Sequence, residues 1–256
     1  MKNNWRVWDK DKEYGDLFYK RATGELPEME SSKVLAKTVS GIICKNDKIL
    51  DVGCGGGHYL RSLDKIIKSD FSYKGIDQTE YYIKRAKEAF SLAVNNNPYR
   101  TVTEFKVGDI FNIPVEDNNA DIVICNNVFL HLPSIEKPLS ELIRVSKKYI
   151  IIRMLIGVSS FRIKQIEKPE KYDENGEPLN FHYYNIYSED YLKTILSKLG
   201  VKDYSFKDDQ DYDPSAFGIE SNYLSTKPDD LTSIINGVQL NVYILQPWKF
   251  LIIKKE

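Results

Sequence analysis

The sequence predicts an α/β protein with a doubly wound, mostly parallel sheet of seven strands and helices on both of its faces. Apolar runs of strand length alternate along the chain with segments in which apolar residues recur at helical spacing. The apolar run at 48–52 enters a glycine-rich turn at 53–57, as strands of such sheets do where a ligand binds. With 256 residues, 42% of them hydrophobic, the chain can bury one large core.

Short apolar runs, several of them rich in isoleucine and valine, predict the strands of this sheet. The expected strands are Lys48–Val52, Tyr73–Ile76, Glu104–Val107, Ile122–Cys125, Tyr149–Arg153, Val201–Phe206 and Trp248–Ile253. The clearest helix between them is Ser188–Leu199, where Ser188 is expected to cap the N-terminus and Gly200 to close the C-terminus. Further helices are expected at Ser32–Ile43 and Thr79–Val94.

Composition and charge argue against several classes of protein. The 36 basic residues nearly balance 37 acidic ones without a long basic run, so a nucleic-acid partner is not favoured. Cys44, Cys54 and Cys125 form no C-x-x-C pair, which argues against a disulfide framework or a zinc site, and we expect no metal. Because the longest apolar stretches are too short to span a bilayer, we expect a cytoplasmic protein without a membrane partner.

The glycines after the first strand indicate a nucleotide-like ligand, because they allow positive φ and a close approach to the backbone. The dinucleotide fingerprint G-x-G-x-x-G/A is not met, since counting from Gly53 ends on His58 and counting from Gly55 ends on Leu60. A phosphate-binding G-x-x-x-x-G-K-[ST] loop is absent as well. A ligand with a ribose and an adenine but no phosphate fits better.

The pattern Asp51-x-Gly53-x-Gly55-x-Gly57 resembles motif I of the class I S-adenosylmethionine (SAM)-dependent methyltransferases. The resemblance covers residues 46–155 well and the last strand more loosely. It implies a Rossmann-like fold, S-adenosyl-L-methionine as the cofactor and S-adenosylhomocysteine as the product.

Three later positions are similar to the same family. Asp77, followed by Gln78, ends the second strand, where the family places an acid that accepts both ribose hydroxyls. Asp109 and Ile110 follow the third strand, where an Asp side chain and the next backbone N–H read the adenine edge. Asn126 lies at the end of the fourth strand. These residues are therefore implied to bind the cofactor.

Other cofactor contacts follow from the same resemblance. Asp51 would orient the glycine loop or meet the SAM amino group through water, and backbone atoms of Gly53 and Asn126 would meet the ammonium. Tyr14, Tyr19 and Arg21 could cap SAM and pair with its carboxylate. Equally, the aromatic residues of the N-terminal region could be ordinary core.

The chain is expected to form a single methyltransferase domain over residues 1–256. Residues 1–45 would form an N-terminal helical cap, residues 46–156 the SAM-binding half and residues 188–256 the C-terminal half of the sheet. Residues 157–187 are long and lack a clear period, which predicts a lid over the site or a mobile linker.

Two histidines are candidates for a general base. His182 stands in an aromatic stretch before the helix that starts at Ser188, and His131 follows the fourth strand. We rank His182 slightly above His131, although a structural role explains either nearly as well. His58 is expected to begin the helix beside the cofactor.

The acceptor is expected to be a small polar molecule, methylated on oxygen rather than nitrogen. The turn after the fourth strand reads Asn-Asn-Val-Phe, not the Asn/Asp-Pro-Pro-Tyr/Phe of enzymes that methylate adenine or glutamine amides. A sugar, a sugar nucleotide or a phosphorylated metabolite of a bacterial glycan or natural-product pathway is the favoured class. The alternatives are a tRNA or protein methyltransferase, a non-catalytic SAM-binding module and a nicotinamide oxidoreductase. The oligomeric state stays open.

Overall fold

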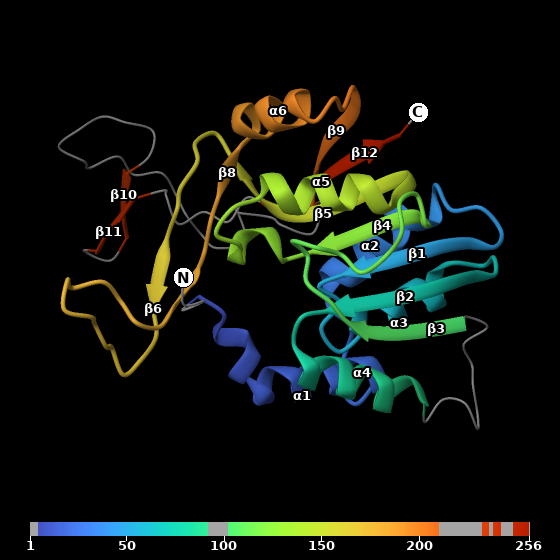
Figure 1. Cartoon of the computed structure of the whole chain (residues 1–256), viewed down its shortest axis with the longest axis horizontal. Helices are drawn as coiled ribbons and strands as arrows, with labels where there is room; N and C mark the ends of the chain where they lie inside the picture. The colour runs from blue at the N-terminus through green and yellow to red at the C-terminus, as the bar shows by residue number, and fades with distance from the viewer. Residues whose placement is uncertain (1–4, 92–101, 210–231, 236–237, 242–247, 256) are drawn as a thin grey trace.

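The computed structural model describes residues 5–91, 102–209, 232–235, 238–241 and 248–255. Its central sheet has eight strands, of which seven follow the order β3-β2-β1-β4-β5-β12-β9 and the short β8 pairs with β5 (Figure 1). The strands are β1 (Asp47–Val52), β2 (Phe71–Asp77), β3 (Val102–Val107), β4 (Ala120–Asn126), β5 (Ser146–Gly157), β8 (Tyr187–Ser188), β9 (Asp203–Asp208) and β12 (Trp248–Lys254). The predicted seven strands are confirmed, and β8 is a short addition to them.

The strand order reverses at β1, which has β2 and β3 on one side and β4 and β5 on the other. The ladders from β3 through β5 are parallel, whereas β12 runs antiparallel to both β5 and β9. In sheets of this kind a crevice opens at the carboxyl ends of the strands where the order reverses. The fold therefore places a ligand site beyond the ends of β1, β2 and β4.

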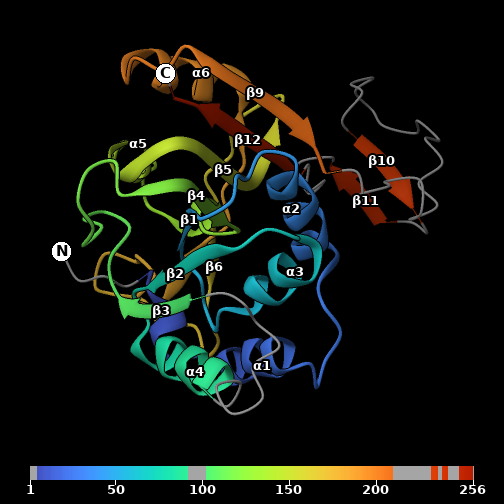
Figure 2. The same cartoon turned by 90° about the vertical axis from the view of Figure 1, so that its right-hand side faces the viewer.

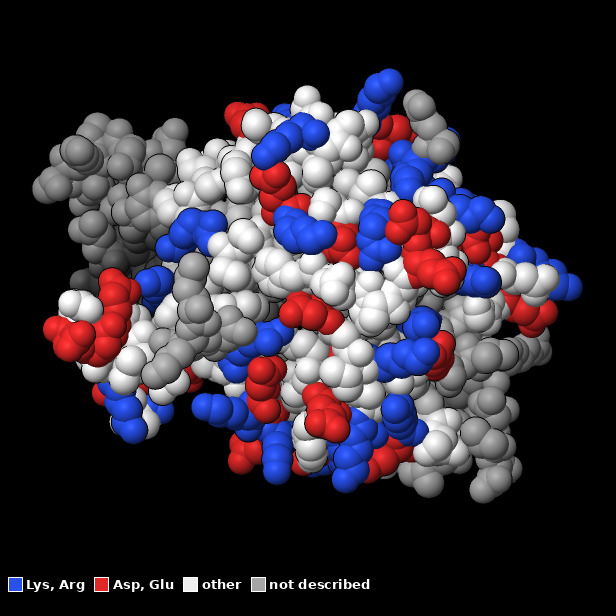
Figure 3. All heavy atoms as spheres, viewed as in Figure 1, with Lys and Arg blue, Asp and Glu red and all other residues white. Residues whose placement is uncertain are grey.

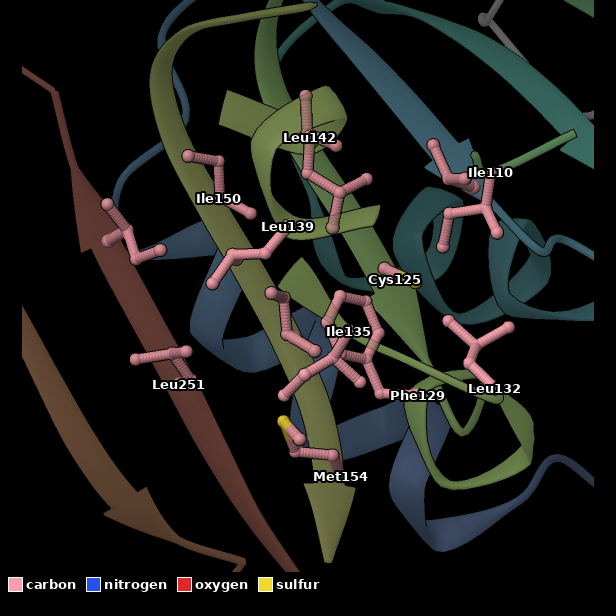
Figure 4. Close-up of a cluster of buried hydrophobic side chains, with 14 of the residues drawn as sticks. Ile110, Cys125, Phe129, Leu132, Ile135, Leu139, Leu142, Ile150, Met154 and Leu251 are labelled. Carbon is pink, nitrogen blue, oxygen red and sulfur yellow. The ribbon is translucent and has the colours of Figure 1, made fainter. Parts of the chain in front are cut away.

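Helices cover both faces of the sheet (Figure 2). They are α1 (Lys12–Thr23), α2 (Glu30–Ser40), α3 (His58–Ile66), α4 (Glu80–Ser91), α5 (Glu136–Val145) and α6 (Glu189–Lys198). Helices α2, α3 and α4 pack on one face, while α5 and α6 pack on the other. Along β4, Ile122 and Ile124 join the first core, and Val123 and Cys125 join the second, since alternate strand residues face opposite sides. Figure 4 shows part of the second core, with Leu139 and Leu142 of α5 over Ile150 of β5.

The ends of the helices follow the local sequence signals. The hydroxyl of Ser188 accepts the backbone N–H of Tyr191 over 3.2 Å, and Gly200 has a φ of 74° just after α6, so both predicted caps are confirmed. Helix α2 begins and ends a few residues before the predicted Ser32–Ile43. For α4, the predicted end at Val94 lies outside the described residues.

The N-terminal region folds back toward the carboxyl ends of the parallel strands. A short 3-10 helix, η1 (Val7–Lys10), leads into α1, which packs against α3 and α4. Figure 1 shows this region at the side toward which the arrowheads of β2 and β4 point. It therefore lies where the carboxyl ends of the parallel strands open.

After β5 the chain forms a hairpin arm, a name used here for residues 158–186. Strand β6 (Lys164–Ile166) pairs antiparallel with β7 (Phe181–Tyr183), and Phe161 bridges to Ile186 at the base of the arm. The sequence did not decide between a lid and a mobile linker for residues 157–187, and the structure has an ordered hairpin there. A second hairpin, β10 (Thr232–Ile235) and β11 (Val238–Asn241), forms its own two-stranded sheet. No helix in the described part of the chain is long and apolar enough to cross a membrane.

Candidate functional site

A cavity lies at the carboxyl ends of the first four strands, and its empty space, mouth included, is about 1020 Å³. Most of the residues predicted to bind the cofactor line it. These are Asp51, Gly53, Gly55, Asp77, Gln78, Ile110 and Asn126. The rest of the lining comes from the N-terminal region, from α3 and from the loop after β4. The lining residues there include Trp5, Trp8, Tyr14, Phe18, His58, Tyr59 and His131.

The glycine turn is built for close contact. Gly53 and Gly55 have φ values of 79° and 54°, in the region that favours glycine. A Cβ atom on Gly53 would lie 2.3 Å from a methyl carbon of Val128, and one on Gly55 would lie 2.9 Å from the Phe18 ring. The backbone N–H of Gly53 donates to the Ile76 carbonyl over 2.7 Å, which ties the turn to β2. Larger side chains would fill the cradle.

Asp77 joins this turn to the end of β2. One carboxylate oxygen accepts the N–H of Gly55 over 2.9 Å, and the other accepts the N–H of Thr79 over 2.8 Å. Burial raises the pKa of Asp77, and these two hydrogen bonds oppose the rise. Each oxygen retains a further acceptor position, which could take a hydroxyl.

Asp51 lies on the cavity wall at the end of β1. Its carboxylate accepts the Tyr73 hydroxyl over 2.6 Å. Burial raises the pKa of Asp51 to about 7, the Tyr73 hydrogen bond lowers it, and the charge of Asp77 raises it further. A cationic group in the cavity would favour the ionised form of this acid.

Several buried polar atoms of the lining have no hydrogen-bond partner among the residues that the structure describes. They are both side-chain polar atoms of Asn126, Nδ1 of His58 and Nε1 of Trp8. Buried polar groups are normally paired, so these atoms mark places where a ligand or water bonds. Together with the glycine cradle and the two carboxylates, the Asn126 amide fits a nucleoside ligand with an amino-acid tail, while the His58 and Trp8 atoms are open to either ligand of the cavity.

Asp109 and Gly57 lie just outside the lining. The Asp109 carboxylate accepts from the guanidinium of Arg6 over 3.1 Å and from the N–H of Phe111 over 2.9 Å. The same guanidinium donates to the Gln78 side chain. Arg6 thus connects the N-terminal segment to two predicted cofactor residues. Gly57, with a φ of 75°, precedes the first turn of α3.

Tyr19 and Arg21 do not line the cavity either. The guanidinium of Arg85 lies 3.8 Å from the centre of the Tyr19 ring, so Tyr19 faces α4. Tyr14, the third candidate of this region, does line the cavity, and so does Phe18, four residues further along α1. The i, i+4 spacing of these two aromatic residues could have revealed the side of α1 that faces the cavity. Tyr59 and Tyr82 also line the cavity, but no spacing pattern in the sequence marks them as cavity residues.

His131 ends a short 3-10 helix, η3 (Phe129–His131), and lines the cavity. Its Nδ1 lies 2.9 Å from the carbonyl oxygen of Tyr183. Because a carbonyl only accepts, Nδ1 is the donor and Nε2 of the neutral ring keeps its lone pair. Burial lowers the pKa of His131 to about 4, so the ring is neutral near pH 7.

His182 lies in the hairpin arm, outside the cavity lining. Its Nδ1 lies 2.5 Å from a carboxylate oxygen of Glu167. The Trp8 ring packs against both imidazoles, with centroid distances of 4.8 Å to His131 and 5.5 Å to His182. The structure therefore places His131 in the cavity lining, whereas His182 contacts Trp8 from outside the lining.

Comparison with known proteins gives related sequences for part of the chain. The demethylmenaquinone methyltransferase of Desulfitobacterium hafniense is 32% identical over 99 residues, which are 39% of this chain and 38% of that protein. A sterol 24-C-methyltransferase of Gibberella zeae is 33% identical over 101 residues, 39% of this chain and 25% of that protein. The matched part thus spans less than two fifths of either relative.

Solved structures share the fold over more of the chain. A SAM-dependent methyltransferase of Methanosarcina mazei has a TM-score of 0.53 at 18% identity, covering 85% of this chain and 96% of that chain. A Methanococcus maripaludis protein assigned to the same class has a TM-score of 0.56 at 15% identity, covering 100% and 97%. The profile of a family described as a methyltransferase domain matches residues 43–200, more than half of this chain. The chain belongs to this methyltransferase-domain family and has the class I fold of SAM-dependent methyltransferases.

Proposed function

We propose that this chain transfers a methyl group from SAM to a hydroxyl group of a small acceptor molecule. One observation carries the proposal: the cavity joins the glycine turn, Asp51, Asp77 and Asn126 to a histidine with a free ring nitrogen. The glycine turn and the three polar side chains would bind a nucleoside with an amino-acid tail. His131 would contact the acceptor.

SAM would supply an electrophilic methyl group, and the chain's own residues would bind and orient the two reactants. We assign Asp77 to the ribose hydroxyls, because each of its oxygens retains an acceptor position. Asp51 and the unpartnered Asn126 amide would meet the charged amino-acid tail. Gly108 and Ile110 would lie against the adenine, and Asp109 would read its edge after releasing Arg6.

The loop after β4 would hold the acceptor. We assign His131 as the general base, with Nε2 taking the hydroxyl proton as the oxygen is methylated. The Tyr183 carbonyl would hold the imidazole in the tautomer that this step needs. His182, ranked higher by the sequence alone, would act through Trp8 rather than on the acceptor.

Other classes of acceptor have less support. The relatives named above carry quinone and sterol acceptors in their names, which agrees with a small molecule. On the face seen in Figure 3, Lys and Arg are interspersed with Asp and Glu, without the basic patch that a tRNA methyltransferase would present. The sequence favours a sugar, a sugar nucleotide or a phosphorylated metabolite as the acceptor, and the panel of acceptors tests this class against the others.

The proposal is tested with the purified chain in two steps. Calorimetric titration with SAM and with S-adenosylhomocysteine measures cofactor binding, with NADH as the comparison ligand. Methyl-labelled SAM is then incubated with a panel of hydroxylated small molecules, bulk tRNA and a protein extract. Labelled small-molecule product supports the proposal. Label confined to tRNA or protein refutes it, and SAM binding without transfer to any acceptor points to a non-catalytic SAM-binding module.

A further inference from the structure

We infer that the acceptor is an uncharged aromatic hydroxyl compound, such as a phenol or a hydroquinone, that stacks on a wall of rings in the cavity. This inference rests on the proposed function and deepens it by naming the acceptor class. The ring wall is defined here as Trp8, Tyr14, Phe18, His58 and His131, all of which line the cavity.

The ring wall is continuous. Trp8 lies 4.8 Å from His131 and 5.4 Å from Tyr14, measured between ring centroids. Tyr14 lies 4.3 Å from Phe18, which stacks on His58 at 4.4 Å with an interplanar angle of 3°. These rings form one contiguous aromatic surface, with neighbouring planes tilted by 36° to 59° except at the Phe18–His58 stack, and another ring packed on it gains area burial and ring–ring contact.

The ring wall meets the glycine turn at Phe18, where a Cβ on Gly55 would lie 2.9 Å from the ring. Its other end, Trp8, packs against His131 in the loop after β4. Asp51, Asp77 and Asn126 belong to the strand-end side, which the proposed function assigns to the cofactor. The acceptor must reach the transferred methyl group from the remaining side. That side is the ring wall and the loop that carries His131.

The charges of the cavity oppose an anionic acceptor. Among the described lining residues there is no lysine or arginine, and the charged side chains are the carboxyl groups of Asp51 and Asp77. Burial lowers the pKa of His58 to about 3 and that of His131 to about 4, so both rings are neutral. Arg21 lies outside the lining, although its charge also lowers the pKa of His58, so a phosphate on the acceptor would lose hydration without direct pairing to a lysine or arginine of the lining.

His131 also suits a phenol. A phenolic hydroxyl has a pKa of about 10, well below that of an aliphatic alcohol, so its proton is easier for a base to take as the oxygen is methylated. The phenol oxygen forms a bond to the methyl carbon as the carbon–sulfur bond breaks, and the electron pair of that bond stays on sulfur. The phenol proton goes to Nε2 of His131, and the products are the aryl methyl ether and S-adenosylhomocysteine.

Four probes of known chemistry test the inference: 2-naphthol, cyclohexanol, methyl β-glucoside and glucose 1-phosphate. The initial rate of S-adenosylhomocysteine formation is measured with each at saturating SAM. We expect kcat/KM for 2-naphthol to exceed that of each other probe by at least about tenfold, in line with a stacked ring held by Trp8. A higher kcat/KM for the glucoside or the phosphate, with 2-naphthol inactive, overturns the inference while leaving the proposed function intact.

Binding without turnover gives the second readout. Calorimetry measures the Kd of 2-naphthol for the complex with S-adenosylhomocysteine, in the wild type and in Trp8→Ala, Trp8→Phe and Tyr172→Ala. Tyr172 is the matched control, since it is an aromatic residue of the hairpin arm that is 47% exposed and outside the lining. We expect Trp8→Ala to weaken binding about tenfold, and Trp8→Phe to restore most of it. If the wild-type complex does not bind 2-naphthol, or if all variants bind it with equal Kd, the ring wall is not the acceptor site. If the chain does not bind S-adenosylhomocysteine, the proposed function itself is refuted.

Discussion

His131 and Tyr183 are joined by a hydrogen bond of 2.9 Å from the imidazole Nδ1 to the backbone carbonyl oxygen. The bond connects the loop after β4 to strand β7 of the hairpin arm. It also fixes the tautomer, so that Nε2 is the basic nitrogen of the ring. The hairpin arm therefore orients the His131 side chain in the cavity, although His182 of the same arm lies outside the cavity lining.

Replacing this base should slow transfer without weakening cofactor binding. We expect His131→Asn to lower kcat by about 10²- to 10⁴-fold, the usual contribution of a general base. Since the pKa of His131 is about 4, the wild-type kcat should not fall through a step near pH 6.5. Steady-state rates from pH 5.5 to 8, with the SAM Kd from calorimetry, measure both effects. A loss of kcat in His182→Asn as large as in His131→Asn would restore His182 as the base.

Asp77 should contribute to SAM affinity through its two carboxylate oxygens. Losing hydrogen bonds to a charged group costs about 1.5–3 kcal/mol each, so Asp77→Ala should weaken SAM binding by at least about tenfold. Calorimetric titration measures the Kd. Glu80→Ala, which removes an exposed acid at the start of α4, is the matched control and should leave the Kd unchanged. An unchanged Kd in Asp77→Ala would remove Asp77 from the ribose site.

Asp51 should make the fold less stable as the pH rises. Its pKa is 3.8 in the reference state and about 7 in the folded chain, because burial penalises the charge. Between these values the unfolded chain has released the proton that the folded chain retains, so the free energy of unfolding falls as the pH rises through this window. Asp51→Asn, which keeps an acceptor for Tyr73, lacks this loss.

The stability of Asp51→Asn relative to the wild type should therefore be greater at pH 8 than at pH 4.5. Urea unfolding curves at the two pH values measure the difference in free energy. Asp70→Asn, an exposed position just before β2, serves as the control for a general charge effect. A difference between Asp51→Asn and the wild type that is the same at both pH values would contradict the raised pKa.

The sheet was predictable because its signals are local. The run 122–125 is wholly apolar and buried, and the run 48–52 contains three buried apolar residues beside the buried Asp51, so both strands stand out. The turn after β1 was predictable for the same reason, because its positive φ values require glycine at particular positions. The Ser188 cap depends only on residues three positions apart.

The cavity wall was less predictable, because it depends on contacts between distant segments. The sequence marks α1 as amphipathic but cannot say which element each side of it meets. Tyr19 was therefore expected at the cofactor, whereas the docking of α1 on α4 turns it to Arg85. Similarly, Arg6 reaches Asp109 across 103 positions of sequence, a pairing that no local pattern contains. The order of His182 and His131 as candidate bases likewise depends on how the hairpin arm lies against the cavity, which no local pattern contains.

Gly53 should not tolerate a side chain. Its φ of 79° would strain an alanine by about 1–3 kcal/mol, and the 2.3 Å approach of the new Cβ to Val128 would add overpacking of about 1–3 kcal/mol. We expect Gly53→Ala to lower the free energy of unfolding by the sum of these effects. Removing the clashing methyl groups with Val128→Ala should relieve only the second.

A double-mutant cycle separates the two contributions. Urea unfolding of Gly53→Ala, Val128→Ala and the double variant gives the coupling energy. We expect the double variant to be more stable than the sum of the single effects predicts. Strict additivity would mean that the backbone conformation alone excludes a side chain at position 53.

The buried ion pair between Arg153 and Asp209 should support both stability and cofactor binding. Two guanidinium nitrogens of Arg153 donate to one Asp209 oxygen at 2.7 Å, and a third donates to the side chain of Asn127 at 2.6 Å. Asn127 lines the cavity with a φ of 59°. Removing Arg153 leaves Asp209 buried and unpaired, so Arg153→Met should destabilise the chain by about 3–5 kcal/mol.

Replacing both charges should separate stability from binding. In Arg153→Met/Asp209→Leu no buried charge is left unpaired, so most of the lost stability should return. The anchor of Asn127 is still missing in this variant, so its SAM affinity should stay weaker than that of the wild type. Urea unfolding and calorimetric titration on the same three proteins measure the two quantities. If SAM affinity returned together with stability, Arg153 would act on the fold alone, and Asn127 would hold its left-handed conformation without it.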